Sequence, residues 1–128
     1  MYTIEKSEKL IKVSDYLDRY VNVEEFLQYC KKCNNYEKLW SCPSYDFNPE
    51  DYWKKYSSLL VTGYKINFGP EVTEKRSMEI MTEVKNRIAE ELFAMESAEP
   101  GSMSLSAGSC GICGTDCCTR LEGKPCLH

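Results

Sequence analysis

Eight cysteines are the residues of this 128-residue chain whose type and spacing best suit chemistry. They form two islands, separated by a long stretch without cysteine. Each island contains a Cys-x-x-Cys pair, and the second also contains an adjacent cysteine pair. Thiolates in this number predict metal binding, because sulfur ligands suit zinc and iron–sulfur clusters. The candidate ligands are Cys30, Cys33 and Cys42 in the first island and Cys110, Cys113, Cys117, Cys118 and Cys126 in the second.

The second island favours an iron–sulfur cluster. Its short gaps are similar to those of the loops that hold clusters in bacterial ferredoxins. Gly108, Gly111 and Gly114 would let the backbone turn tightly and direct amides at the cluster sulfurs. We therefore expect one or two clusters, of the 4Fe–4S type, that transfer electrons or sense the redox state.

A structural zinc site is the alternative, and it belongs to a different class of function. Cys30, Cys33, Cys110 and Cys113 would supply the four tetrahedral ligands that zinc needs. The protein would then be a zinc-stapled interaction module without a redox role, and four cysteines would have no explanation. The single histidine, His128, is not expected to be a ligand.

Three other uses of the cysteines have less support. Disulfides are rare in the reducing cytoplasm, and the chain does not begin with an apolar run of signal-peptide length. Thioredoxin-like chemistry lowers a thiol pKa at a helix N-terminus, whereas Cys30 and Cys33 are expected at a helix C-terminus. An enzyme with one open iron position lacks an acid–base pair or nucleophile motif, so the catalytic residues stay unknown.

Composition limits the partners. The net charge of −4 disfavours nucleic acid, which usually binds a basic face. No apolar stretch approaches the roughly 20 residues of a membrane span. We expect a cytoplasmic protein that acts with a redox partner protein and binds neither nucleic acid nor membrane. The sequence does not indicate its oligomeric state. The length fits a single cysteine-rich metal-binding domain over residues 1–128.

The elements that position these islands are predicted to form an α+β fold. Residues 59–68, rich in β-branched and aromatic side chains, predict a strand, and residues 71–96 predict a long helix. We expect a small sheet covered by this amphipathic helix, with the two cysteine-rich loops meeting at one end. The core-facing stripe of the helix is predicted to contain Met81, Val84, Ile88, Leu92 and Met95.

Shorter elements are predicted from their start signals. Ser14, Asn22 and Asn48 are expected to cap helices that begin just after them. The first helix would cover residues 15–20, the second would end near residues 30–33, and the third would end near residue 56. Short strands are expected near residues 10–13 and 103–107.

The cysteines and their neighbours resemble a known family, the predicted metal-binding proteins called domain of unknown function 2284. This resemblance implies metal ligation at six of the cysteines and implies no established activity. Those six are Cys30, Cys33, Cys42, Cys110, Cys113 and Cys126. The resemblance rests on Cys30-x-x-Cys33, Tyr36, Trp40-Ser41-Cys42-Pro43, Asp46-Phe47, Ala107-Gly108-Ser109-Cys110-x-x-Cys113 and Gly123-Lys124-Pro125-Cys126.

The chain departs from the family pattern in two places. Cys117 and Cys118 are adjacent where the pattern has one cysteine, so the fourth ligand is ambiguous. We expect one of them to complete the second island and the other to turn toward the first. The chain also stops at Leu127 and His128, where relatives continue, which suggests a C-terminally truncated form.

Overall fold

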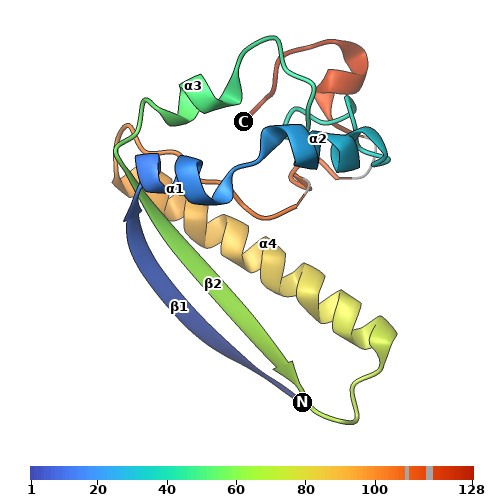
Figure 1. Ribbon diagram of the computed structural model, residues 1–128. Helices are drawn as coiled ribbons and strands as arrows, with labels where there is room; N and C mark the ends of the chain where they lie inside the picture. Colours follow the sequence, from blue (N-terminus) through green and yellow to red (C-terminus); the bar gives the residue numbers. More distant parts are fainter. Residues whose placement is uncertain (109, 115–116) are drawn as a thin grey trace. The chain divides into compact units, whose positions relative to one another are not determined.

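The computed structural model describes residues 1–108, 110–114 and 117–128, and it has the predicted α+β fold (Figure 1). Strands β1 and β2 form a two-stranded antiparallel sheet. The elements in chain order are β1 (Tyr2–Lys12), α1 (Val13–Tyr20), α2 (Val23–Lys31), α3 (Pro49–Trp53), β2 (Ser58–Phe68), α4 (Glu74–Ala98) and the 3-10 helix η1 (Thr119–Glu122).

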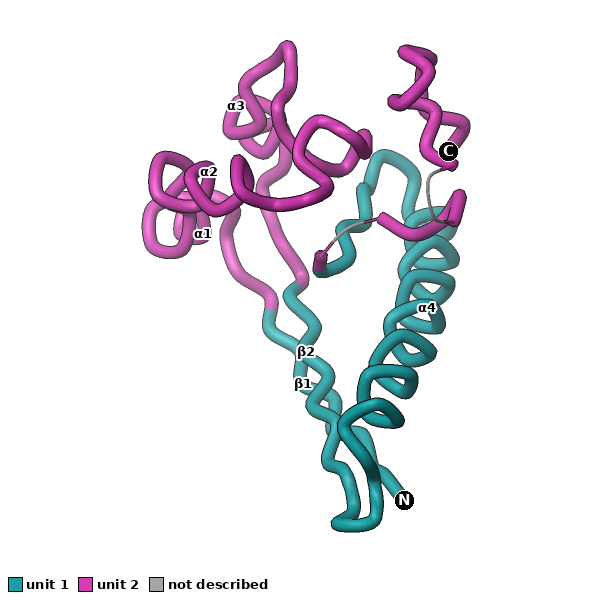
Figure 2. The backbone as a smooth tube through the Cα atoms, turned by 90° about the vertical axis from the view of Figure 1, so that its right-hand side faces the viewer, with its two compact units in different colours: residues 1–9, 61–107 teal, residues 10–60, 108–128 magenta. Residues whose placement is uncertain are grey.

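The chain divides into two compact units (Figure 2). The sheet–helix unit comprises residues 1–9 and 61–107, and the cysteine unit comprises residues 10–60 and 108–128. All eight cysteines belong to the cysteine unit. The folding of residues 1–128 as a single domain stays a prediction.

Helix α4 supplies the core of the sheet–helix unit. It begins after Thr73, whose hydroxyl oxygen accepts a hydrogen bond from the Arg76 amide at 3.2 Å. Tyr64 of β2 donates its hydroxyl to Glu91 of α4 at 3.2 Å, which ties the strand to the helix. The long helix predicted over residues 71–96 is thus confirmed. Among the described residues, no helix combines the length and apolarity that a membrane span requires.

The predicted core-facing stripe of α4 is partly wrong. Met81 and Met95 are 51% and 48% exposed, whereas Ile80 is fully buried. The buried face recurs every four residues from Ile80, and Met81 lies about 100° around the helix from that position. Glu96 occupies this face near its end because Ser104 donates to its carboxylate from both the amide and the hydroxyl. The correctly predicted members are Val84, Ile88 and Leu92.

The strands also differ from the prediction. Strand β2 is confirmed, whereas β1 extends from Tyr2 to Lys12 instead of covering only residues 10–13. Charged residues occupy the centre of β1, so no alternation of apolar side chains marked the strand in the sequence. Nine of its eleven residues are exposed. Residues 103–107 form no strand, and Ser104 of this segment instead donates to the Glu96 carboxylate of α4. Ser102, just before the segment, donates its hydroxyl to the carbonyl of Glu99, the residue that follows α4, at 2.6 Å.

Two helices of the cysteine unit begin at the predicted caps. The Asn22 side chain accepts from the Glu25 amide at 3.1 Å and donates to the Glu25 carboxylate at 3.0 Å. This reciprocal pair satisfies a first-turn amide and holds the start of α2. The Asn48 side chain accepts from the Glu50 amide at 3.0 Å at the start of α3.

The predicted start of α1 and end of α3 are wrong. Helix α1 begins at Val13, one residue before the predicted cap Ser14, and its N-cap Lys12 makes no side-chain cap bond. The Val13 amide instead donates to the Ser57 carbonyl at 3.0 Å, so pairing with the chain near β2 fixes this start. Helix α3 ends at Trp53, earlier than the predicted end near residue 56.

Candidate metal centre

The first cysteine island follows directly from helix α2. Cys30 lies in the last turn of this helix and Cys33 lies just beyond it, as predicted. The Cys33 amide donates to the Cys30 carbonyl at 3.0 Å, which turns the chain back on itself. Over the two islands, Cys30, Cys42, Cys113 and Cys118 are half-buried, and Cys33, Cys110, Cys117 and Cys126 are exposed.

Cys33 in the first island and Cys126 in the second each accept a backbone hydrogen bond from the residue two positions ahead. The Asn35 amide donates to Cys33 Sγ at 3.5 Å, and the His128 amide donates to Cys126 Sγ at 3.4 Å. Around metal centres, hydrogen bonds to sulfur tune the reduction potential. The same two bonds would act on a cluster if Cys33 and Cys126 were among its ligands.

Arg120 connects the two islands. It lies in η1, between Cys118 and Cys126, and its guanidinium donates to three carbonyl oxygens of the first island. These bonds reach Leu39 at 3.0 Å, Cys42 at 2.6 Å and Ser44 at 2.6 Å. The guanidinium carbon also lies 5.1 Å from the centre of the Trp40 ring, a cation–π distance. Arg120 thus holds the backbone on both sides of Cys42.

Two further hydrogen bonds join the same segments. The Trp40 indole donates to the Lys124 carbonyl at 2.9 Å, two residues before Cys126. The Cys110 amide donates to the Ser41 hydroxyl at 3.2 Å, at the other end of the second island. Residues next to Cys42 therefore contact both ends of the second island.

The thiols of the second island influence one another. Burial raises the pKa of the Cys113 thiol, and the negative charges of four neighbouring cysteines raise it further. A bound cation would relieve this repulsion, because thiolates coordinate metal in the deprotonated form. The four neighbours, from the strongest effect to the weakest, are Cys118, Cys110, Cys126 and Cys117.

The pKa of Tyr45 is affected by charged groups of both islands. Burial raises the pKa of its phenol, and the charges of Cys42 and Cys30 raise it further, while Arg120 acts in the opposite direction. The phenol ring stacks on Phe47 with 5.2 Å between the ring centres. Tyr45 therefore shares one environment with two first-island thiols and the guanidinium from the second island.

Two of the three glycines predicted to shape the second island adopt a conformation that favours glycine. Gly108 and Gly114 have φ values of 75° and 85°, a region that side-chain-bearing residues rarely occupy. Gly111 does not, but its carbonyl accepts from the Gly114 amide at 3.2 Å and closes a turn. The loop around Cys113 is therefore tight.

The ligand set itself stays a prediction. Among the described residues, no three His, Cys, Asp or Glu side chains are close enough together to hold one metal ion. The predicted division of Cys117 and Cys118 between the islands is likewise untested, and their neighbours Thr115 and Asp116 lie outside the described residues. The chemistry of the donors does fit a thiophilic metal, since eight thiols lie in one compact unit.

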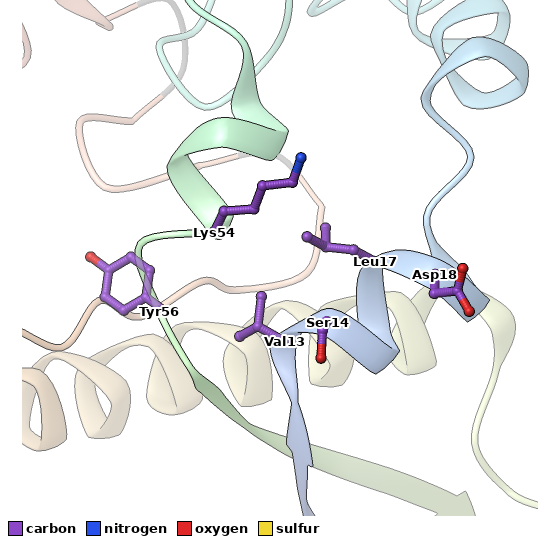
Figure 3. Close-up of a pocket in the computed structure, with 6 residues that line it drawn as sticks. All are labelled: Val13, Ser14, Leu17, Asp18, Lys54 and Tyr56. Atoms are coloured by element: carbon purple, nitrogen blue, oxygen red, sulfur yellow. The ribbon is translucent and has the colours of Figure 1, made fainter.

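The cysteine unit also contains a pocket that is lined by other residues. It has a volume of about 390 Å³, and Figure 3 shows its six lining residues. Val13 and Leu17 give it an apolar side, and Asp18 and Lys54 bring opposite charges. No cysteine lines this pocket, so it is not the candidate metal centre.

The fold and the thiol-rich unit define a small α+β protein with a candidate metal centre. Residues 17–128 match the family described as Predicted metal-binding protein (DUF2284), and the chain belongs to this family. The family resemblance inferred from the motifs is thus confirmed. No curated protein and no solved structure matched the chain.

The matched region contains both cysteine islands and one residue that sequence reasoning missed. Arg120 was not predicted as part of the site, because its partners are backbone carbonyls 76 to 81 positions away in the chain. The available signal was its position between Cys118 and Cys126, inside the second island. The match begins after β1, so this strand lies outside the family region.

Proposed function

We propose that this protein binds an iron–sulfur cluster and uses it to transfer electrons or to sense the redox state. The observation that carries the proposal is that both islands belong to one compact unit, in which Arg120, Trp40 and Ser41 join them by hydrogen bonds. Thiols from sequence-distant segments are thereby available to one centre or to two neighbouring ones. Eight cysteines would suffice for two clusters with four thiolates each.

Three features support an iron–sulfur cluster. The short gaps between the cysteines of the second island are similar to those of the loops that hold clusters in bacterial ferredoxins. The amide bonds to Cys33 and Cys126 sulfurs would help stabilise the negative charge of a cluster. Four of the eight cysteines are exposed, which would leave part of a cluster near the surface and within reach of a redox partner protein.

A zinc-stapled interaction module is the second candidate. The turn at Cys30 and Cys33, with the Asn35 amide on the second sulfur, would suit half of a tetrahedral zinc site. Cys110 and Cys113 would supply the other half, and the metal would reinforce the connection that Arg120 already makes between the islands. This function would involve no electron transfer.

Metal and sulfide analysis of protein purified without oxygen separates the two functions. We expect iron and inorganic sulfide in similar amounts and a broad absorption band at about 400 nm. Cys113→Ser should lower the iron content, and Leu105→Ser, an exposed position outside the cysteine unit, should not. Tight zinc at about one ion per chain, with no sulfide after anaerobic reconstitution, would replace the iron–sulfur function by the zinc module.

A further inference from the structure

Strand β1 has an outer edge that no other strand in the described part of the chain covers. The sheet formed by the described residues contains only β1 and β2, so β1 has a neighbour on one side alone. Nine of its eleven residues are exposed, and only Tyr2 and Ile11 are half-buried. An uncovered edge of this length presents backbone N–H and C=O groups that can pair with another strand.

The side chains of β1 are complementary to those of the same strand running in the opposite direction. At its centre, the charges of Glu5, Lys6, Glu8 and Lys9 are arranged symmetrically in opposite signs around Ser7. If two copies pair antiparallel about Ser7, Glu5 of each faces Lys9 of the other, and Lys6 of each faces Glu8. Directly opposed residues in an antiparallel pair project to the same face and interact.

We propose that β1 pairs antiparallel with β1 of a second copy of this chain, with Ser7 on the two-fold axis. The pairing would join two two-stranded sheets into one four-stranded sheet with an isologous interface. It goes beyond the proposed metal function and does not depend on it, since β1 contains no cysteine.

The charge pattern selects one register. Symmetric pairing about an axis perpendicular to the sheet places one residue opposite its own copy. Pairing centred on Lys6 would oppose two ammonium groups, and pairing centred on Glu8 would oppose two carboxylates. Like charges directly opposite each other destabilise a sheet. Centring on Ser7 avoids both conflicts and creates four opposite-charge pairs.

Apolar residues extend the match on both sides of the charged centre. In the same register, Ile4 of each copy faces Leu10 of the other, and these side chains are 37% and 69% exposed in the single chain. Thr3 would face Ile11 in the same way. Pairing would therefore cover apolar surface that β2 leaves in contact with water.

The existing ion pairs of β1 leave its charges accessible. Lys6 contacts Glu8 at 3.0 Å and Lys65 contacts Glu5 at 3.7 Å, and all four side chains are 45% to 74% exposed. Charged residues on an edge strand usually prevent pairing. In β1, the charged residues would prevent pairing in the registers centred on Lys6 and Glu8, and they would favour pairing in the register centred on Ser7. Strand β2 lacks this pattern, and five of its eleven residues are half-buried.

Sedimentation equilibrium of the full chain, purified without oxygen, tests the proposal. At about 0.15 M salt we expect a concentration-dependent dimer that weakens in 1 M salt, because exposed charges are then screened. Lys6→Glu places carboxylates opposite each other at two positions, and it should raise the dimer dissociation constant about tenfold or more. The double variant Lys6→Glu/Glu8→Lys should restore the dimer. Lys75→Glu, the same charge change at an exposed site on α4, should leave it unchanged.

Cross-linking then tests the register. Ser7→Cys would bring two thiols directly opposite each other, with Cα atoms about 4.5 to 5.5 Å apart, which suits a disulfide. Thr3→Cys is the matched control, because its two copies would lie about 27 Å apart. Mass spectrometry of the peptides should find a link through position 7 and none through position 3. A monomer at all concentrations, a dimer insensitive to the charge variants, or no link through position 7 would each overturn the proposal.

Discussion

Arg120 donates a hydrogen bond to the carbonyl oxygen of Cys42 at 2.6 Å, so a residue of the second cysteine island holds the backbone of the first. The carbonyls of Leu39 and Ser44 accept from the same guanidinium. One planar guanidinium thus forms hydrogen bonds with three carbonyl oxygens. Arginine suits this role because its five N–H donors have a fixed geometry. The same cation lies close enough to Tyr45 to oppose the effect of the Cys42 thiolate on its pKa.

Replacing Arg120 should affect both stability and the metal centre. Arg120→Gln removes the three carbonyl bonds, and we expect the free energy of unfolding to fall by about 2 kcal/mol. Loss of the positive charge should also make reduction of a cluster less favourable, so the midpoint potential should decrease. Chemical denaturation and a redox titration measure the two effects. Arg19→Gln, the same change at an exposed position of α1, is the control; an equal effect there would contradict a specific role for Arg120.

Removing the metal should lower the melting temperature. Metal that binds only the folded state adds its binding free energy to stability, about 4 kcal/mol at a thousandfold excess over the dissociation constant. Differential scanning calorimetry with and without a chelator, and of Cys113→Ala, measures this contribution. Identical melting temperatures for metal-free and metal-loaded protein would show that metal binding does not stabilise the fold.

The adjacent cysteines should have different roles. Among the neighbours of Cys113, Cys118 has the strongest electrostatic effect and Cys117 the weakest, and Cys118 is the more buried of the two. We therefore expect Cys118→Ser to disrupt a centre formed with Cys110, Cys113 and Cys126, and Cys117→Ser to leave that centre intact. Iron content and the electron paramagnetic resonance spectrum of the reduced protein distinguish the variants. Equal losses in both would show that the two thiols are not divided in this way.

The stability of the metal-free protein should fall at alkaline pH. The folded state raises the pKa of Cys113 above its ordinary value of 9.0. As the pH rises past that value, the unfolded chain loses this proton first, which favours unfolding. Urea denaturation between about pH 8 and pH 10 should show the decrease, and Cys113→Ser should reduce it. Stability that rises over this range in both proteins would contradict the prediction.

Local signals in the sequence predicted part of this structure. Asn22 and Asn48 were recognised as caps because their side chains bond to amides two or three residues away. The start of α1 at Val13 was missed because it depends on the Ser57 carbonyl, which is distant in the sequence. Strand β1 was underestimated because its charged residues do not alternate with apolar ones.

In the candidate site, too, some residues could be predicted from the sequence and others could not. The cysteines could be found from their spacing, since ligands of one centre are often close together in the chain. Arg120 could not be assigned a role, because a guanidinium that binds backbone carbonyls places no demand on the side chains of its partners. The choice between Met81 and Ile80 as the buried residue likewise depends on packing, which hydrophobicity alone does not resolve.

The bond between the Trp40 indole and the Lys124 carbonyl gives the protein an intrinsic optical probe. Emission from an indole responds to its hydrogen bond and to a nearby cation, and Trp40 has both. The second tryptophan, Trp53, stacks on Tyr16 and can be replaced by phenylalanine to isolate the signal. Fluorescence of that variant would then record in real time when the segment preceding Cys126 docks against the first island as the chain refolds.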